Sequence, residues 1–181
     1  MGDPFLRALP QDAKLPTAVL GLHTQPGRFK GRCQITRGCG LLIALALRIG
    51  RFPPTGEDLP VSLTTQKVGE DWLWRRNFAG HLTQSRLSYD AGWNCVREQI
   101  GGLTIWIRPV WRQDRLGIEV VRMKICGLPC PKALLPQSFS FEWQDAQGRF
   151  RFDISARLPW LGSLIRYHGW LTRDHEGPAQ P

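Results

Sequence analysis

From residue 59 onward, short segments rich in Val, Ile, Trp, Phe and Thr recur at intervals of about ten residues. Gly, Asp or Asn stands in many of the gaps, and these gaps are too short to hold helices. The segments lie at residues 59–68, 72–79, 81–89, 93–99, 103–112, 116–125, 138–145, 149–157 and 163–172. Residues 28–36 add an earlier strand, and the Pro-rich residues 126–137 predict a crossover. Even spacing with tight turns is typical of an antiparallel meander.

The alternation of apolar and polar residues within the segments predicts which face of the sheet is buried away from solvent. Trp72, Trp74 and Phe78 share a face with Arg76. Two later segments alternate most clearly, with an apolar set made of Phe139, Phe141, Trp143, Phe150, Phe152 and Ile154. We expect these side chains to face inward and the intervening polar residues to face outward. A sheet that is apolar on one face must be covered by something else.

Residues 41–49 (LLIALALRI) supply the obvious cover. Their Leu and Ala residues favour a helix over a strand, and a helix that is apolar on all sides should be enclosed by protein. The sequence therefore predicts an α+β, mostly β fold in a single domain. We expect a strongly curved antiparallel sheet or incomplete barrel of about eight to ten strands, wrapping a short apolar helix near residues 41–50.

The length of 181 residues, of which 42% are hydrophobic, fits one domain with a sizeable core. We expect a flexible N-terminal segment over residues 1–14, a β-rich domain over 15–173 that opens with a short helix at 17–22, and a flexible tail over 174–181. No run of eighteen apolar residues predicts a membrane-spanning helix.

The formal net charge of +9 is unevenly distributed, because no acidic residue lies between Asp12 and Glu57. A basic segment over residues 13–56 favours phosphate, an anionic membrane surface or an acidic partner. The alternative is a solvated basic edge in an Arg-rich protein. No nucleic-acid-binding motif accompanies the charge, so nucleic acid is not an expected partner. The candidate anion- or membrane-binding residues are Arg28, Lys30, Arg32, Arg37, Arg48 and Arg51.

Motifs for catalysis, metals and cofactors are missing from the sequence. The five cysteines form no CxxC pair, and no His stands at metal-ligand spacing from a Cys pair, so no metal site is expected. Gly38 and Gly40 lack the third glycine of a dinucleotide fingerprint and favour a turn that begins a helix. No signal peptide is visible, so we expect a cytoplasmic location and reduced thiols. Because these motifs are missing, we also expect no cofactor and no assignable catalytic residue.

Polar residues inside the aromatic strands are the best candidates for a binding site. Facing inward, they would form a charge-assisted network that orients a ligand head group; facing outward, they would form surface ion pairs of small value. An inward Glu98 or Glu142 would be the first candidate for acid–base work. The candidate ligand-binding residues are Trp74, Arg76, Arg86, Glu98, Glu142, Arg166 and Tyr167.

Several short strings carry a family resemblance through their order and spacing. They include Arg37-Gly38, Trp74-Arg75-Arg76-Asn77-Phe78, Glu98-Gln99-Ile100-Gly101, Gly127-Leu128-Pro129-Cys130-Pro131, Leu158-Pro159-Trp160-Leu161-Gly162 and Tyr167-His168-Gly169-Trp170-Leu171. Over roughly residues 15–172 the chain resembles the bacterial domain-of-unknown-function family numbered four-one-six-six. The resemblance implies a single cytoplasmic domain, joined in some proteins to a saccharopine-dehydrogenase-like reductase domain. It supplies no activity and no catalytic residues.

Three functional hypotheses follow. The first is a non-enzymatic domain that holds an apolar or amphipathic small ligand inside the curved sheet. The second is an interaction module whose basic segment 13–56 docks on an anionic membrane surface or an acidic partner, which would make the protein peripheral to the membrane. The third is an enzyme, or an accessory domain of a reductase-type partner, that uses buried Arg and carboxylate pairs. The oligomeric state is left open.

Overall fold

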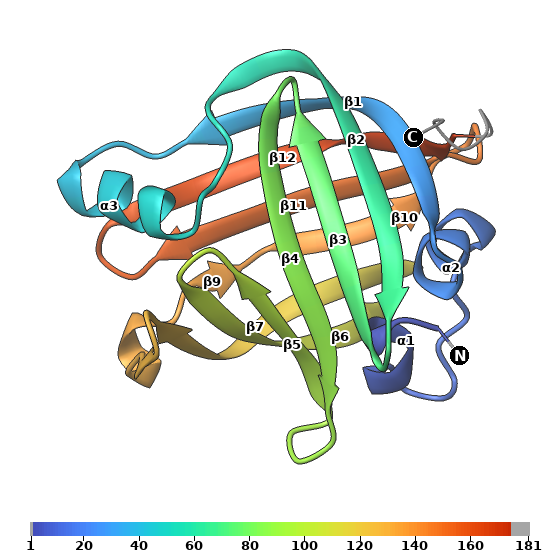
Figure 1. Cartoon of the computed structure of the whole chain (residues 1–181), viewed down its shortest axis with the longest axis horizontal. Helices are drawn as coiled ribbons and strands as arrows, with labels where there is room; N and C mark the ends of the chain where they lie inside the picture. The colour runs from blue at the N-terminus through green and yellow to red at the C-terminus, as the bar shows by residue number, and fades with distance from the viewer. Residues whose placement is uncertain (1, 175–181) are drawn as a thin grey trace.

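The computed structural model describes residues 2–174, and it shows ten antiparallel strands closed into a barrel (Figure 1). Neighbouring strands follow the order β10-β11-β12-β1-β2-β3-β4-β5-β6-β7, and β7 pairs back with β10 to close the ring. The strands are β1 (Gly27–Arg37), β2 (Gly56–Val68), β3 (Asp71–Phe78), β4 (His81–Asp90), β5 (Cys95–Ile100), β6 (Leu103–Arg112), β7 (Arg115–Ile125), β10 (Ser140–Gln144), β11 (Phe150–Leu158) and β12 (Gly162–Arg173). The expected mostly β, single-domain antiparallel fold is confirmed, and the ring is complete.

Tight turns join successive strands, as the spacing of Gly, Asn and Asp predicted. The β3–β4 turn illustrates the chemistry, because Ala79 and Gly80 both have positive φ values, of 49° and 99°. Two successive residues with positive φ match the right-handed twist of the flanking strands. The side-chain Oδ1 of Asn77 accepts a hydrogen bond from the Gly80 amide at 2.6 Å, which fixes this turn.

Glycines allow β1 and β12 to approach each other closely. A Cβ on Gly31 would lie 1.8 Å from the carbonyl oxygen of Trp170, and one on Gly169 would lie 2.1 Å from that of Arg32. No side chain fits at these distances. The two glycines therefore permit the register in which Gly31 faces Leu171 and Gly169 faces Cys33.

The inner face follows the predicted alternation on β11 but is reversed on β10. Phe150 and Phe152 are buried, as expected. On β10, however, Ser140 and Glu142 are buried, whereas Phe141 and the preceding Phe139 are 38% and 60% exposed. The prediction for this strand is therefore wrong. The polar side chains tolerate the interior because they are hydrogen-bonded there, as described below.

Helices α1 (Pro4–Ala8) and α2 (Thr17–Thr24) lie together at one end of the barrel (Figure 1). The core includes Phe5, Ala8, Val19 and Leu22, so residues 1–14 contain an ordered helix where a flexible segment was expected. The side chain of Asp3 caps α1 by accepting a hydrogen bond from the Phe5 amide at 3.0 Å. The flexible tail was expected over residues 174–181, and all of it except Asp174 lies outside the described residues.

Helix α3 (Leu41–Ile49) lies at the opposite end, which we call the mouth (Figure 1). The helix is present where the sequence predicted it, but it is not enclosed. Ile43 and Leu47 are buried, whereas Leu41 is 91% exposed and Leu42 and Leu45 are also exposed. The helix rests across the barrel's edge instead of entering it, and the Gly102 amide donates a hydrogen bond to its last carbonyl, that of Ile49, at 2.9 Å.

The expected crossover over residues 126–137 is formed by three short elements, of which β9 lies on the side of α3 (Figure 1). They are β8 (Leu128–Pro129), the 3-10 helix η1 (Lys132–Leu134) and β9 (Gln137–Ser138).

No helix within residues 2–174 is long and apolar enough to cross a membrane.

Candidate functional site

A cavity of about 540 Å³ occupies the interior of the barrel. It extends from Phe5 and Leu22, on the two N-terminal helices, to Leu42 and Leu45 of α3 at the mouth. Its walls come from β2 to β7 and from β10 to β12, and they are predominantly aliphatic and aromatic. Barrels of more than eight strands enclose ligand cavities, and this volume lies within the range of sites for small molecules.

An Arg–Glu pair stands in the cavity wall. Nη2 of Arg76 on β3 lies 3.6 Å from Oε1 of Glu98 on β5, and both side chains are mostly buried, at 18% and 13% exposure. Nη1 of Arg76 also donates to Oγ of Ser85 at 2.9 Å, and the guanidinium lies 5.1 Å from the ring centre of Trp74. These contacts fix the guanidinium, and the two opposite charges offset each other inside an apolar space.

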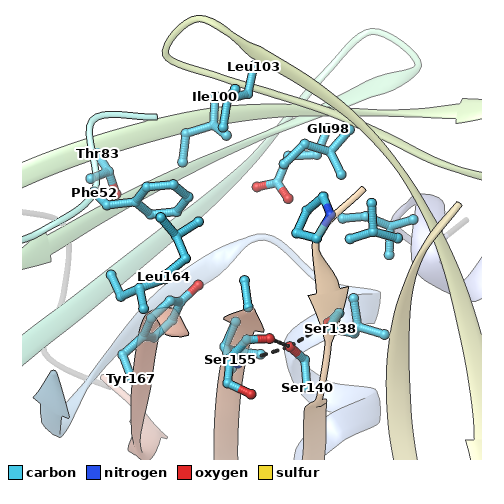
Figure 2. Close-up of a pocket in the computed structure, with 18 of the residues that line it drawn as sticks. Phe52, Thr83, Glu98, Ile100, Leu103, Ser138, Ser140, Ser155, Leu164 and Tyr167 are labelled. Atoms are coloured by element: carbon cyan, nitrogen blue, oxygen red, sulfur yellow. Dashed lines mark hydrogen bonds between the residues drawn. The ribbon is translucent and has the colours of Figure 1, made fainter. Parts of the chain in front are cut away.

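Tyr167 on β12 brings a hydroxyl to the opposite wall. Figure 2 shows the Tyr167 hydroxyl and the Glu98 carboxylate pointing into the cavity from facing sides. Burial raises the pKa of Tyr167 to about 12, with the negative charges of Glu98 and Glu142 adding to the shift and the positive charge of Arg76 opposing it. Tyr167 is therefore a neutral hydrogen-bond donor at physiological pH.

Three serines form a small polar cluster near the lower wall (Figure 2). Oγ of Ser140 accepts hydrogen bonds from Oγ of Ser138 at 2.8 Å and from the Ser155 amide at 3.1 Å, and it donates to the Ser155 carbonyl at 3.2 Å. These bonds account for the inward position of Ser140 on β10. All three serines line the cavity.

A buried triad of ionisable side chains closes the floor of the cavity. Nδ1 of His23 lies 2.6 Å from Oδ2 of Asp3, and Nε2 lies 2.8 Å from Oε2 of Glu142. Burial alone would lower the pKa of His23, but the charges and hydrogen bonds of Asp3 and Glu142 outweigh it and raise the pKa to about 10. Burial raises the pKa of Asp3 despite the adjacent imidazolium. His23 is thus a doubly donating cation between two carboxylates.

Aromatic rings pack against the imidazole of this triad. The centre of the His23 ring lies 5.1 Å from that of Phe5 and 5.6 Å from that of Trp74. The buried Nε1 of Trp74 has no hydrogen-bond partner within residues 2–174. Because both ring nitrogens of His23 are engaged, it has no free lone pair for a metal, and no metal-binding cluster of His, Cys, Asp or Glu occurs in this part of the chain.

The structure divides the candidate ligand-binding residues into two groups. Five of them line the cavity: Trp74, Arg76, Glu98, Glu142 and Tyr167. The other two lie on the outer surface, where Arg86 pairs with Asp71 at 2.7 Å and Arg166 pairs with Asp153 at 2.6 Å. Arg86 and Arg166 therefore belong to exposed cross-strand pairs instead of the binding site, and such pairs contribute little stability.

The candidate anion-binding residues are also divided. Arg28, Lys30 and Arg32 alternate on the outer face of β1, where Lys30 pairs with Asp174 at 3.0 Å and Arg32 with Asp58 at 2.5 Å. The guanidinium of Arg37 donates to the Phe52 carbonyl at 2.5 Å. Arg48 and Arg51 are exposed beside α3. The basic segment thus does not form one continuous surface.

Sequence reasoning missed Asp3, His23 and the serine cluster. A signal for Asp3 is present, because Asp followed by Pro is a common start of a helix, with the Asp as N-cap and the Pro at the first position. His23 lies one residue beyond the predicted end of its helix and carries no local motif. Nothing in the local sequence brings residues 3, 23 and 142 together, because they meet only where the two N-terminal helices pack against the barrel.

The thiols show no sign of activation. Cys33 and Cys95 are buried, and burial raises the pKa of both, to about 11 for Cys33. A catalytic cysteine needs a lowered pKa, so these two behave as small apolar side chains.

Comparison with known proteins adds one match. A family model described as a domain of unknown function (DUF4166) matches residues 15–171. No curated protein matches the chain. The matched range runs from just before α2 to the end of the barrel, so it contains His23, Glu142 and nearly every residue that lines the cavity, but not Asp3. Because the match covers most of the sequence, this protein belongs to the DUF4166 family of domains of unknown function.

Proposed function

We propose that the barrel binds a small, largely apolar molecule that carries a neutral polar group. The observation that supports this proposal most directly is the cavity of about 540 Å³, whose apolar lining is interrupted by a few convergent polar groups. That combination is typical of sites for small molecules, in which apolar walls provide affinity and a few polar atoms provide orientation.

The charge balance of the wall favours a neutral head group. Arg76 and Glu98 offset each other, and Tyr167 is an uncharged hydroxyl. An anionic head group would have to compete with Glu98 for Arg76 and would meet the negative charge of Glu98 at close range. A hydroxyl can instead donate to Glu98 and accept from Tyr167 without burying a net charge.

The enzymatic alternative has less support. Glu98 and Glu142 both face the cavity, as that hypothesis required. However, Glu98 is paired with Arg76, and Glu142 is held by the imidazolium of His23. Carboxylates fixed in ion pairs serve the orientation of a ligand better than they serve proton transfer.

A displacement assay tests the proposal. The protein is titrated with an apolar fluorescent dye such as Nile red, and the bound dye is then displaced with hexadecanol, methyl palmitate or palmitate, which share one chain and differ in head group. We expect saturable dye binding near one site per chain, with displacement by hexadecanol at concentrations about tenfold or more below those of palmitate. Equal displacement by the carboxylate would contradict the neutral head group.

A variant with a filled cavity, compared with a variant that carries the same new side chain on the outer surface, tests where the dye binds. Ala156 on β11 lines the cavity, so Ala156→Phe places a ring in the space that the ligand would occupy. Ser62→Phe adds the same ring at an exposed position on β2. We expect Ala156→Phe to abolish dye binding and Ser62→Phe to leave it unchanged. Dye binding that survives Ala156→Phe in a folded protein would place the site elsewhere and overturn the proposal.

A further inference from the structure

The mouth of the barrel carries seven of the thirteen large hydrophobic side chains that are exposed within residues 2–174. Three segments surround it: residues 38–54 with α3, residues 126–137 with β8 and η1, and residues 157–162 in the β11–β12 turn. Each segment contributes residues to the lining of the same cavity, so the three border one opening. Their strongly exposed apolar residues are Leu41, Leu42, Leu45, Leu128, Leu134, Trp160 and Leu161.

The leucine and tryptophan side chains at the mouth have large exposed fractions for apolar residues. Leu41 is 91% exposed, Trp160 83% and Leu128 73%. Isolated apolar residues on a surface need no explanation, but a cluster gathered around one opening marks an interaction site. Leu42, Leu45 and Leu161 are exposed and also line the cavity, so the apolar surface outside continues into the apolar interior.

The charges carried by these three segments are all positive. The three segments contain no Asp or Glu and carry the exposed residues Arg48, Arg51, Lys132 and Arg157. None of these four forms an ion pair within residues 2–174. Glu119 on β7 borders the outer groove beside Trp160, and it is paired with Arg112 at 3.8 Å. The basic groups of the mouth are therefore available to an anionic partner.

We propose that the mouth docks on an anionic lipid bilayer, with the exposed Leu and Trp side chains in the headgroup region and the four basic residues at the lipid phosphates. Short apolar helices flanked by Arg, and Trp at the boundary between apolar and polar phases, are the features that bind membrane interfaces. The long basic side chains can place their charges at the headgroups while their stems cover apolar surface. Docking in this orientation would open the cavity toward the phase in which an apolar ligand dissolves.

The docking surface proposed at the mouth differs from the row of basic side chains on the outer face of β1. Arg28, Lys30 and Arg32 lie on the outer wall of the barrel, and at least two of them have acidic partners. The two surfaces can be tested separately because they share no residue. Docking is also measured without any ligand, so its failure would be distinguishable from a failure of the proposed cavity binding.

Vesicle flotation of the full chain tests the proposal. The probes are vesicles of phosphatidylcholine with one quarter phosphatidylglycerol, and vesicles of phosphatidylcholine alone. An environment-sensitive dye on the exposed Cys39 and Cys126, which both belong to the mouth segments, gives a second readout of docking. We expect binding to the anionic vesicles that weakens with added salt, with little binding to the neutral vesicles.

Two pairs of variants identify the surface. Leu41→Ser with Trp160→Ser removes apolar contact at the mouth. Val68→Ser with Trp93→Ser does the same at the far ends of β2 and β4. Arg48→Gln with Lys132→Gln removes two charges at the mouth, and Arg28→Gln with Arg32→Gln removes two from β1. We expect both mouth variants to weaken vesicle binding about tenfold or more, and both controls to stay within about twofold of the unmodified protein.

Three outcomes would overturn the proposal. The first is the absence of binding to anionic vesicles. The second is binding that the β1 variant abolishes and the mouth variants preserve. The third is the absence of vesicle binding together with a dimer in solution that dissociates in the double variant Leu41→Ser with Trp160→Ser. The mouth would then be an interface between copies of the chain. Circular dichroism on each variant establishes that the barrel is folded.

Discussion

Nε2 of His23 lies 2.8 Å from Oε2 of Glu142, and this contact joins α2 to the inner wall of the barrel. Through its other nitrogen, His23 also holds Asp3, the N-cap of α1. One imidazole thus connects both N-terminal helices to β10. The floor of the cavity depends on a charged network that is entirely buried.

Replacing His23 by Gln should destabilise the protein strongly. The substitution removes the cation and leaves two buried carboxylates facing each other, and breaking a buried ion pair costs about 3–5 kcal/mol of the free energy of unfolding. Urea denaturation measures the loss. His81→Gln is the matched control, because the side chain of His81 makes one hydrogen bond in the described part of the chain, to the Arg51 carbonyl at 3.1 Å. Similar losses in the two variants would show that the triad does not hold the floor.

The stabilisation by His23 should depend on pH. Its pKa in the folded protein is about 10, above the ordinary histidine pKa of 6.5, so the stabilisation is complete below about pH 6.5 and is lost as the pH rises toward 10. Between pH 7 and pH 9, the difference in unfolding free energy between the wild type and His23→Gln should shrink by up to about 2–3 kcal/mol. The raised pKa of Cys33 affects both proteins equally and cancels in the difference. A difference independent of pH would mean that His23 is not charged in the folded state.

A methyl group on Gly31 should disrupt the pairing of β1 with β12. The added Cβ would lie 1.8 Å from the Trp170 carbonyl oxygen, and neither backbone can retreat without breaking the ladder. We expect Gly31→Ala to lower the thermal midpoint sharply or to prevent folding. Gly21→Ala is the control, because a Cβ on Gly21 meets nothing within 4 Å and that residue lies in α2. This second substitution should raise stability by about 0.5–1 kcal/mol.

Tyr167→Phe should reduce discrimination between ligand head groups while leaving apolar affinity nearly unchanged. The substitution removes one hydroxyl that faces the cavity and keeps the ring, which packs against Phe78 at 5.9 Å and Phe152 at 6.2 Å between ring centres. In the displacement assay, hexadecanol should lose about tenfold in potency relative to a hydrocarbon of equal length. An unchanged ratio of the two potencies would exclude Tyr167 from contact with the head group.

Occupation of the cavity should protect Cys130 from alkylation. This thiol is partly buried and lines the cavity near the mouth, whereas Cys39 and Cys126 are exposed. Mass spectrometry after a short pulse of iodoacetamide should show Cys39 and Cys126 modified, Cys33 and Cys95 unmodified, and Cys130 modified more slowly when hexadecanol is present. Equal slowing at Cys39 would indicate a general effect of the additive and contradict local protection.

The strand pattern was predictable because turns and alternation are local properties. The segments expected from residue 59 onward match the observed strands to within about three residues. At the turn before β4, Gly80 adopts the positive φ that a tight turn requires. The closure of β10 against β7 was not predictable, since pairing between residues that are distant in sequence leaves no local mark. The ring is therefore more complete than a curved sheet or an incomplete barrel.

The site was only partly predictable for the same reason. On β10, the alternation of Phe and polar residues indicates two faces but not which one is inside. Glu142 is inside because His23, which is 119 residues away in sequence, supplies its partner. Arg76 shares a face of β3 with Trp72 and Trp74, which indicates the side that faces the cavity. Arg86 on β4 alternates with the buried Ser85 and Leu87 and faces solvent. The exposure of Leu41 likewise depends on how far α3 enters the barrel.

Closure of the ring also limits how other molecules can approach. Each of the ten barrel strands has a neighbour on both sides over at least part of its length, so the ring contains no edge strand that is free along its whole length. Recognition through side chains at the barrel's ends or on its outer wall is therefore favoured over the addition of a strand. The same geometry protects the protein from the edge-to-edge association through which open sheets aggregate.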